Sequence, residues 1–381
     1  MCSLSYFVVY FARNILSTVT PQIMASGSHT AEFFSSLSSV FFALYAVGQL
    51  INGMVGDRVK ARYMMSFGLG LAGVCNLLFP SLIHSSGGAL AAYGLTGFFL
   101  SMIYAPMTKV IAENTEPVHA TRCSLGCTFA AFFGSPFAGA AAALLTWQAV
   151  FYTSAGALIL MGLLCFALFL LFEKQGIIRY NQYGREAERS RNVHLLFRNR
   201  IVRFTLISVI TGIIRSTVVF WLPSYFSQHL GFTPDQAAGL FTGATLVIAL
   251  SAFASVFAYE RLGRNLDLTL FLSFAAAACA FFLAFLIGAP AVNIALFVFA
   301  IFASNCAATM LWSRYCPGLR DTGMVSTATG FLDFMSYMAA AASSAAFAGA
   351  VERLGWRCII LLCAALMVIG AATVLPRRTP R

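Results

Sequence analysis

The chain has 381 residues, of which 60% are hydrophobic and only 10% are charged, and its mean hydropathy is +0.82. Soluble domains carry about 25% charged residues, so this composition excludes a soluble globular protein and indicates a membrane protein. The formal net charge of +11 would suit a nucleic-acid partner, but the placement of the basic residues, described below, argues against one.

Twelve apolar runs predict twelve transmembrane helices, since a bilayer core of about 30 Å needs about 20 apolar residues per helix. We expect the spans near 4–25, 36–56, 63–83, 88–111, 122–146, 148–172, 201–226, 236–258, 266–288, 291–313, 324–349 and 355–376. The first run lacks a basic n-region and a small-residue cleavage site, so we interpret it as a retained helix rather than a signal peptide.

The basic residues gather on one side of these spans. The turns after spans 1, 3, 5, 7 and 9 contain no Lys or Arg, whereas the turns after the even spans and the C-terminus hold 20 of the 24 basic residues. The positive-inside rule then predicts that both termini are cytoplasmic. The basic excess therefore indicates orientation and contact with the lipid bilayer, not a nucleic-acid partner.

The longest polar stretch, from Glu173 to Arg200, separates six predicted spans from six. We interpret 1–172 as an N-terminal six-helix half, 173–200 as a cytoplasmic linker and 201–381 as a C-terminal six-helix half.

The two halves repeat the same landmarks at matching positions. Arg13 is followed eight residues later by Pro21, and Arg215 is followed eight residues later by Pro223. An acid–Arg pair begins 44 residues after the first arginine and 45 residues after the second. This repetition predicts an all-α membrane protein of two pseudo-symmetric halves, an organisation typical of secondary transporters with a substrate site near the midplane.

Arg13 and Arg215 are expected in the middle of their spans, where an arginine costs about 2.5–3.5 kcal/mol. They should therefore line a polar cavity, and their guanidinium forks suit a phosphate or a carboxylate. Tyr6, Tyr10 and Arg13 share one helix face, so the tyrosine hydroxyls could also reach a ligand. The competing interpretations are a structural ion pair for the arginines and ordinary packing for the tyrosines.

Asp333 is the one acid that we place inside a predicted span and away from its ends. It could balance Arg215 or Arg13 when the site is empty, bind a proton, or make a hydrogen bond between packed helices. The sequence leaves these three roles open.

The loop after span 2 reads GQLINGMVGDRVKARYMM and resembles the signature loop of the major facilitator superfamily. The matching residues are Gly53, Asp57, Arg58 and Arg62, and a weaker second copy holds Glu260, Arg261 and Arg264. Lys60 stands where the usual pattern has glycine. The resemblance covers the whole chain and implies a monomer with gating loops, whereas the alternative is an exposed loop with weak ion pairs.

YFVVYFARN in span 1 and GIIRSTVVFWLPSYF in span 7 are similar to the organophosphate:phosphate antiporter family. The resemblance implies that Arg13 and Arg215 face each other and hold a phosphate, with Tyr337 of STATGFLDFMSYM nearby. This chain departs from the glycerol-3-phosphate members at three positions. Gln49 replaces a lysine of the second helix, and alanine replaces a histidine of the fifth helix. Asp333 is an additional acid. The substrate therefore need not be glycerol-3-phosphate.

We therefore expect a secondary transporter of the inner membrane that moves a sugar phosphate, glycerol phosphate or inorganic phosphate by alternating access, in exchange for phosphate. The alternatives are a proton-coupled carboxylate symporter that uses Asp333 and a transporter-like sugar-phosphate sensor. No nucleotide loop, metal-ligand cluster or nucleophile triad stands out, so we expect no enzyme activity, no metal and no cofactor.

Overall fold

The computed structural model describes residues 1–26, 29–56, 59–114, 117–179, 197, 199–316, 319 and 325–375. Throughout these residues the regular structure is helical, as the hydropathy predicts. The helices before the linker are α1 (Cys2–Ala25), α2 (Ala31–Gly56), α3 (Ala61–Leu82), α4 (Ser86–Leu100), α5 (Tyr104–Asn114), α6 (Pro117–Leu144) and α7 (Trp147–Lys174). Those after it are α9 (Ile201–Gly212), the π-helix η2 (Ile213–Val218), α10 (Val219–Ser224), the π-helix η3 (Tyr225–His229), α11 (Pro234–Ala249), α12 (Ser251–Arg261), α13 (Leu266–Leu286), α14 (Pro290–Met310), the π-helix η4 (Leu311–Tyr315) and α16 (Val325–Thr373).

Eight helical runs among the described residues are long and apolar enough to cross a bilayer, and two shorter apolar helices accompany them. The longest run, Ala328–Thr373, has 46 residues and bends at Gly355, whose φ of 76° and ψ of 162° are not helical. Its length is about twice what one crossing needs. The count of twelve spans and the cytoplasmic placement of the termini stay predictions.

Several predicted spans are divided in the structure, and two of them show how. The span expected at 88–111 contains the end of α4 at Leu100 and the start of α5 at Tyr104, and Asn52 Nδ2 donates a hydrogen bond of 2.7 Å to Ser101 Oγ at this break. The span expected at 201–226 holds α9, η2, α10 and part of η3. Hydropathy measures the length of an apolar run, but it does not register a local change in backbone hydrogen bonding.

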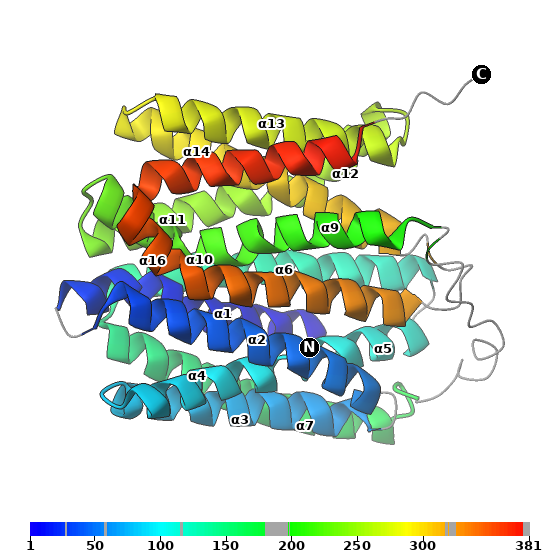
Figure 1. Cartoon of the computed structure of the whole chain (residues 1–381). Helices are drawn as coiled ribbons and strands as arrows, with labels where there is room; N and C mark the ends of the chain where they lie inside the picture. Colours follow the sequence, from blue (N-terminus) through cyan, green and yellow to red (C-terminus); the bar gives the residue numbers. More distant parts are fainter. Residues whose placement is uncertain are drawn as a thin grey trace. The chain divides into compact units, whose positions relative to one another are not determined.

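The chain forms two compact units. The first unit consists of Met1–Glu188 with Leu222–Thr245, and the second consists of Arg189–Trp221 with Leu246–Arg381. In the first unit α1 packs on α6, and α3 packs on α7 and α4; in the second, α13 packs on α14 and α16 (Figure 1). The boundaries at 172 and 201 stay a prediction.

Aromatic packing forms the interior of the first unit. The Phe79 ring stacks on Phe151 at 4.4 Å between centroids, and the Phe41 ring stacks on Tyr93 at 4.8 Å. All four side chains are buried. Because these rings come from α2, α3, α4 and α7, they hold these four helices together.

Candidate functional site

Arg13 of α1 lies among aromatic rings within the first unit. Its guanidinium carbon is 5.5 Å from the Tyr10 ring centroid, 5.7 Å from that of Phe42 and 5.3 Å from that of Tyr45. Cation–π contacts of this kind stabilise a charge that has lost part of its hydration. The rings of α2 therefore offset part of the cost of placing an arginine inside a membrane span.

Tyr6 and Tyr10 lie together on the face of α1 that carries Arg13. Their ring centroids are 5.0 Å apart, and the Tyr6 ring also stacks on Tyr104 of α5 at 5.7 Å. The Tyr93 hydroxyl donates a hydrogen bond of 3.4 Å to the Arg13 carbonyl. The sequence does not predict Tyr93 near Arg13, because the contact depends on how two helices face each other.

A close approach between α1 and α6 fixes the position of this helix face. At Gly134 of α6, an added Cβ would lie 2.7 Å from the Phe11 nitrogen and 2.8 Å from the Phe7 oxygen. Only glycine fits against the α1 backbone at this distance. The turn of α1 that holds Tyr10 is therefore positioned by backbone contact with α6.

Arg215 of the second unit lies beside Asp333 and Tyr337 of α16. Its Nη2 donates a hydrogen bond of 3.4 Å to the Tyr337 hydroxyl and is 4.0 Å from Asp333 Oδ1. Arg215 and Asp333 are partly buried, with side chains 28% and 18% exposed, and Tyr337 is buried. The structure thus brings together three of the predicted site residues, and the ion pair among them is long.

Arg215 stands within the π-helix η2, which the sequence does not predict. A π-helical turn holds an extra residue and often occurs at functional sites. Thr217 Oγ1 donates a hydrogen bond of 3.1 Å to the Ala340 carbonyl and lies 2.6 Å from Ser343 Oγ, which secures η2 to α16. No pattern in the stretch GIIRSTVV distinguishes this turn from an ordinary helix.

Arg62, the last residue of the signature loop, forms a well-defined ion pair. Its Nη1 is 2.9 Å from Glu173 Oε2, and the two side chains are only 11% and 15% exposed. The pair joins the start of α3 to the end of α7 within the first unit. Gly53 lies in α2, whereas Asp57 and Arg58 fall outside the described residues.

The second copy of the loop lies at the end of α12 and in the turn that follows. Glu260 and Arg261 are the last residues of α12, and the Arg261 guanidinium lies 5.1 Å from the Phe257 ring centroid. Arg264 is exposed and adopts a φ of 58°, directly after Gly263 at a φ of 66°. The gating role of both loops stays a prediction.

Metal ligands are not gathered in the part of the chain that the structure describes, where no group of three or more His, Cys, Asp or Glu side chains is arranged to hold an ion. The expectations of no metal and no cofactor stay expectations.

Comparison with known proteins places these features in a family. Residues 2–341 match the family described as Major Facilitator Superfamily. The chain belongs to this superfamily. It is accordingly a multi-pass protein of the inner membrane, and its family consists of transporters rather than enzymes.

Curated relatives confirm the narrower resemblance to organophosphate:phosphate antiporters. The chain is 40% identical over 76 residues to the "Membrane sensor protein UhpC" of Salmonella typhimurium, which is 20% of this chain and 17% of that protein. It is 24% identical over 260 residues to the "Glycerol-3-phosphate transporter" of Bacillus subtilis, which is 61% of this chain and 58% of that protein. The matches thus span less than two thirds of these relatives.

Solved structures confirm the fold. A bacterial homolog of the human lysosomal transporter Spinster, inward-facing and unoccupied, superimposes with a TM-score of 0.79 at 14% identity, covering 98% of this chain and 94% of that chain. A D-xylose–proton symporter gives a TM-score of 0.76 at 13% identity, covering 98% and 96%.

Proposed function

We propose that this protein is a secondary transporter of a small phosphorylated organic anion or inorganic phosphate, which it moves by alternating access in exchange for phosphate. The observation that carries the proposal is that each unit holds an arginine in the middle of a predicted span, and that each of these two arginines is surrounded by groups suited to an anion site. Arg13 lies among aromatic rings, and Arg215 lies against a phenol hydroxyl.

The chemistry of these arginines favours a phosphate ester. A partly dehydrated guanidinium offers a planar fork of donors that matches two phosphate oxygens, and such charge-assisted bonds are about twice as strong as neutral ones. The relatives named for glycerol-3-phosphate and hexose phosphate transport support the same substrate class. We propose that Arg13 and Arg215 are both required for anion recognition, with Tyr6, Tyr10 and Tyr337 as supporting hydroxyl donors.

An exchange assay tests the proposal. Full-length protein is reconstituted into liposomes preloaded with inorganic phosphate, and labelled phosphate is added outside. We expect saturable uptake that depends on internal phosphate and that glucose 6-phosphate or glycerol 3-phosphate inhibits. Uptake that proceeds equally into phosphate-free liposomes would contradict exchange, and failure of every phosphate compound to compete or exchange would contradict the substrate class.

A substitution at Asp333 distinguishes phosphate exchange from proton-coupled carboxylate symport. Because its carboxylate is 4.0 Å from Arg215 Nη2, we infer that it balances the arginine in the empty site and yields to the substrate anion. We expect Asp333→Asn to tighten phosphate binding, because the arginine loses its competing anion, and to leave exchange insensitive to a pH gradient. The measurement is the phosphate-dependent shift in melting temperature, with uptake measured with and without a gradient.

The opposite outcome would favour the symporter. If wild-type uptake follows an inward proton gradient and Asp333→Asn abolishes that dependence, Asp333 is a proton carrier. Asn305→Asp is a control that adds a carboxylate in α14 without removing Asp333, and we expect it to change neither property.

The local match to a membrane sensor favours a second candidate, a protein that binds a sugar phosphate and signals to a partner kinase. The match covers only 20% of the chain, so it does not extend to the whole protein. A sensor would show hexose-phosphate binding without phosphate exchange, and would co-purify with a kinase.

A further inference from the structure

A cavity at one end of the second unit is separate from the site proposed above. It has a volume of about 300 Å³ and lies where α9 begins, α13 begins and η4 ends. Its lining includes Arg200, Asp267, Arg314 and Tyr315. The proposed transport function gives this cavity no role.

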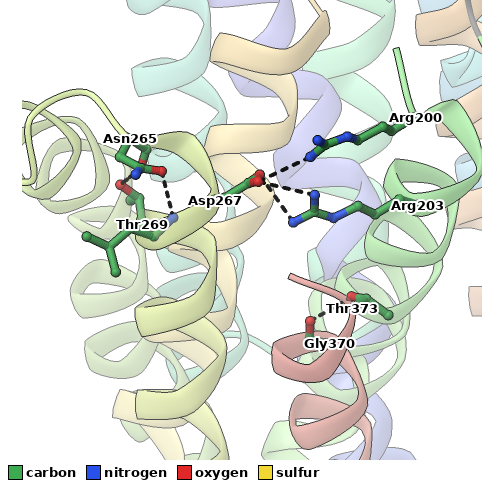
Figure 2. Close-up of polar contacts among 8 residues, drawn as sticks. Arg200, Arg203, Asn265, Asp267, Thr269, Gly370 and Thr373 are labelled. Atoms are coloured by element: carbon green, nitrogen blue, oxygen red, sulfur yellow. Dashed lines mark hydrogen bonds and ion pairs between the residues drawn. The ribbon is translucent and has the colours of Figure 1, made fainter. Parts of the chain in front are cut away.

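The cavity carries an excess of positive charge. Asp267 accepts hydrogen bonds from Arg200 Nη1 at 3.3 Å and from Arg203 Nη1 at 3.2 Å, and Figure 2 shows the single carboxylate between the two guanidinium groups. Arg314 lines the same cavity and places its guanidinium 5.1 Å from the Tyr259 ring centroid. Two arginines therefore share the Asp267 carboxylate and Arg314 adds a third positive charge, so the described charged residues in and beside the cavity are net positive.

Some of the donor capacity in this cluster is not used. The Nε and Nη2 atoms of Arg203 are buried and make no hydrogen bond to any described residue, although Nη2 lies 3.2 Å from Asp267 Oδ1. Arg200 is 60% exposed and adopts a left-handed backbone conformation, with φ 60° and ψ 37°. Buried donors without acceptors are unfavourable, and Asp267 by itself does not satisfy both guanidinium groups that it contacts.

The other half of the cavity is apolar. The Phe204 and Tyr315 rings stack at 3.5 Å between centroids, and Leu266 and Leu319 contribute to the lining. The Tyr315 hydroxyl donates a hydrogen bond of 3.0 Å to the Asn199 carbonyl, which keeps its ring against Phe204. A ligand with an anionic group and an adjoining apolar part would match both halves.

The position of the cavity indicates the source of such a ligand. Three of the runs that are long and apolar enough to cross a bilayer begin or end at its walls, at Ile201, Leu266 and Tyr315, and the ends of such runs are where lipid headgroups are expected. On α9, Val202 is 67% exposed and provides an apolar surface beside the cavity. Basic pockets among transmembrane helices at this depth suit lipid headgroups.

We propose that this cavity binds the headgroup phosphate of an anionic phospholipid, with Arg200 and Arg314 contacting the phosphate and the Phe204–Tyr315 pair contacting the start of the acyl chains. A free phosphate ion could bind to the arginines, but it would make no contact with the apolar half of the cavity.

Native mass spectrometry tests the proposal on the full-length protein in an uncharged detergent. Phosphatidylglycerol and phosphatidylcholine with the same acyl chains are titrated separately. We expect the wild-type protein to retain phosphatidylglycerol more strongly than phosphatidylcholine. Arg200→Gln and Arg314→Gln should each weaken it about fivefold, equivalent to about 1 kcal/mol per basic residue at a membrane surface.

Control variants separate local charge from total charge and from folding. Arg353→Gln removes an exposed arginine near the Gly355 bend, at the other end of the helices, and should leave lipid binding unchanged. Arg314→Lys keeps the charge and should retain most of the binding, and a melting curve of each variant verifies that it is folded.

Three outcomes would overturn the proposal. Equal retention of phosphatidylglycerol and phosphatidylcholine by the wild-type protein would overturn it directly. Equal losses in Arg353→Gln and Arg314→Gln would show that only total charge matters. Complete displacement of the lipid by inorganic phosphate would assign the cavity to a free anion. None of these measurements depends on phosphate exchange, so they remain decisive if the transport proposal fails.

Discussion

Replacing Arg13 or Arg215 with lysine is expected to lower phosphate exchange by about 100-fold, because loss of a two-point charge-assisted contact costs on the order of 3 kcal/mol. Lysine keeps the positive charge, so the loss would isolate the geometry of the guanidinium fork. Exchange of labelled phosphate in preloaded liposomes measures the effect for each variant separately. Arg215→Lys should also lose the hydrogen bond to the Tyr337 hydroxyl in its present geometry.

Arg353→Lys is the matched control for this pair of substitutions. Arg353 is exposed and lies near the bend at Gly355, several helical turns after Tyr337 along α16. We expect it to exchange phosphate at the wild-type rate. If Arg13→Lys and Arg215→Lys both retain more than half of the wild-type exchange rate, as the control does, neither guanidinium group recognises the transported anion.

Gly212→Ala is expected to be the most damaging single-methyl change near Arg215. An added Cβ would lie 2.7 Å from the Ser336 carbonyl oxygen and 3.0 Å from the Ser336 Cα, both backbone atoms of α16 that cannot rotate away. Overpacking of this kind costs about 1–3 kcal/mol. Separating α9 from α16 would also move Arg215 away from Asp333 and Tyr337, so both the melting temperature and the phosphate affinity should fall.

Gly330→Ala provides the control within α16, because an added Cβ there meets no atom within 4 Å. Alanine favours a helix over glycine by about 1 kcal/mol, so this variant should be as stable as wild type or more stable. Wild-type stability and phosphate affinity in Gly212→Ala would show that the helices can separate without disturbing Arg215.

The membrane class, the fold family and the two arginines of interest could be predicted from the sequence. Hydropathy and charge placement are properties of each segment by itself, so the bilayer's demand for apolar runs can be recognised without knowing which helices are neighbours. Arg13 and Arg215 stand out for the same reason, since a permanent charge within an apolar run is costly wherever the helix packs. The signature loop named the superfamily, which residues 2–341 confirm.

The partners of these residues were decided by the tertiary structure. Asp333 had three open roles in the sequence, and packing of η2 on α16 puts its carboxylate beside Arg215. Glu173 was assigned to the linker, yet it pairs with Arg62 across the ends of α7 and α3. Each of these contacts depends on the rotation and depth of one helix relative to another, and an apolar run specifies neither.

The cavity in the second unit could not be predicted from the sequence for the same reason, because it depends on how helices pack. In the sequence, Arg200, Arg203 and Arg314 are basic residues on the cytoplasmic side of predicted spans, where they serve orientation. Only the convergence of α9, α13 and η4 brings Arg200 and Arg203 to Asp267 and places Arg314 in the same cavity lining, beside the stacked rings of Phe204 and Tyr315. The sequence by itself determined that the chain enters a membrane with arginines inside its apolar spans. The packing of the helices decided which side chains contact those arginines.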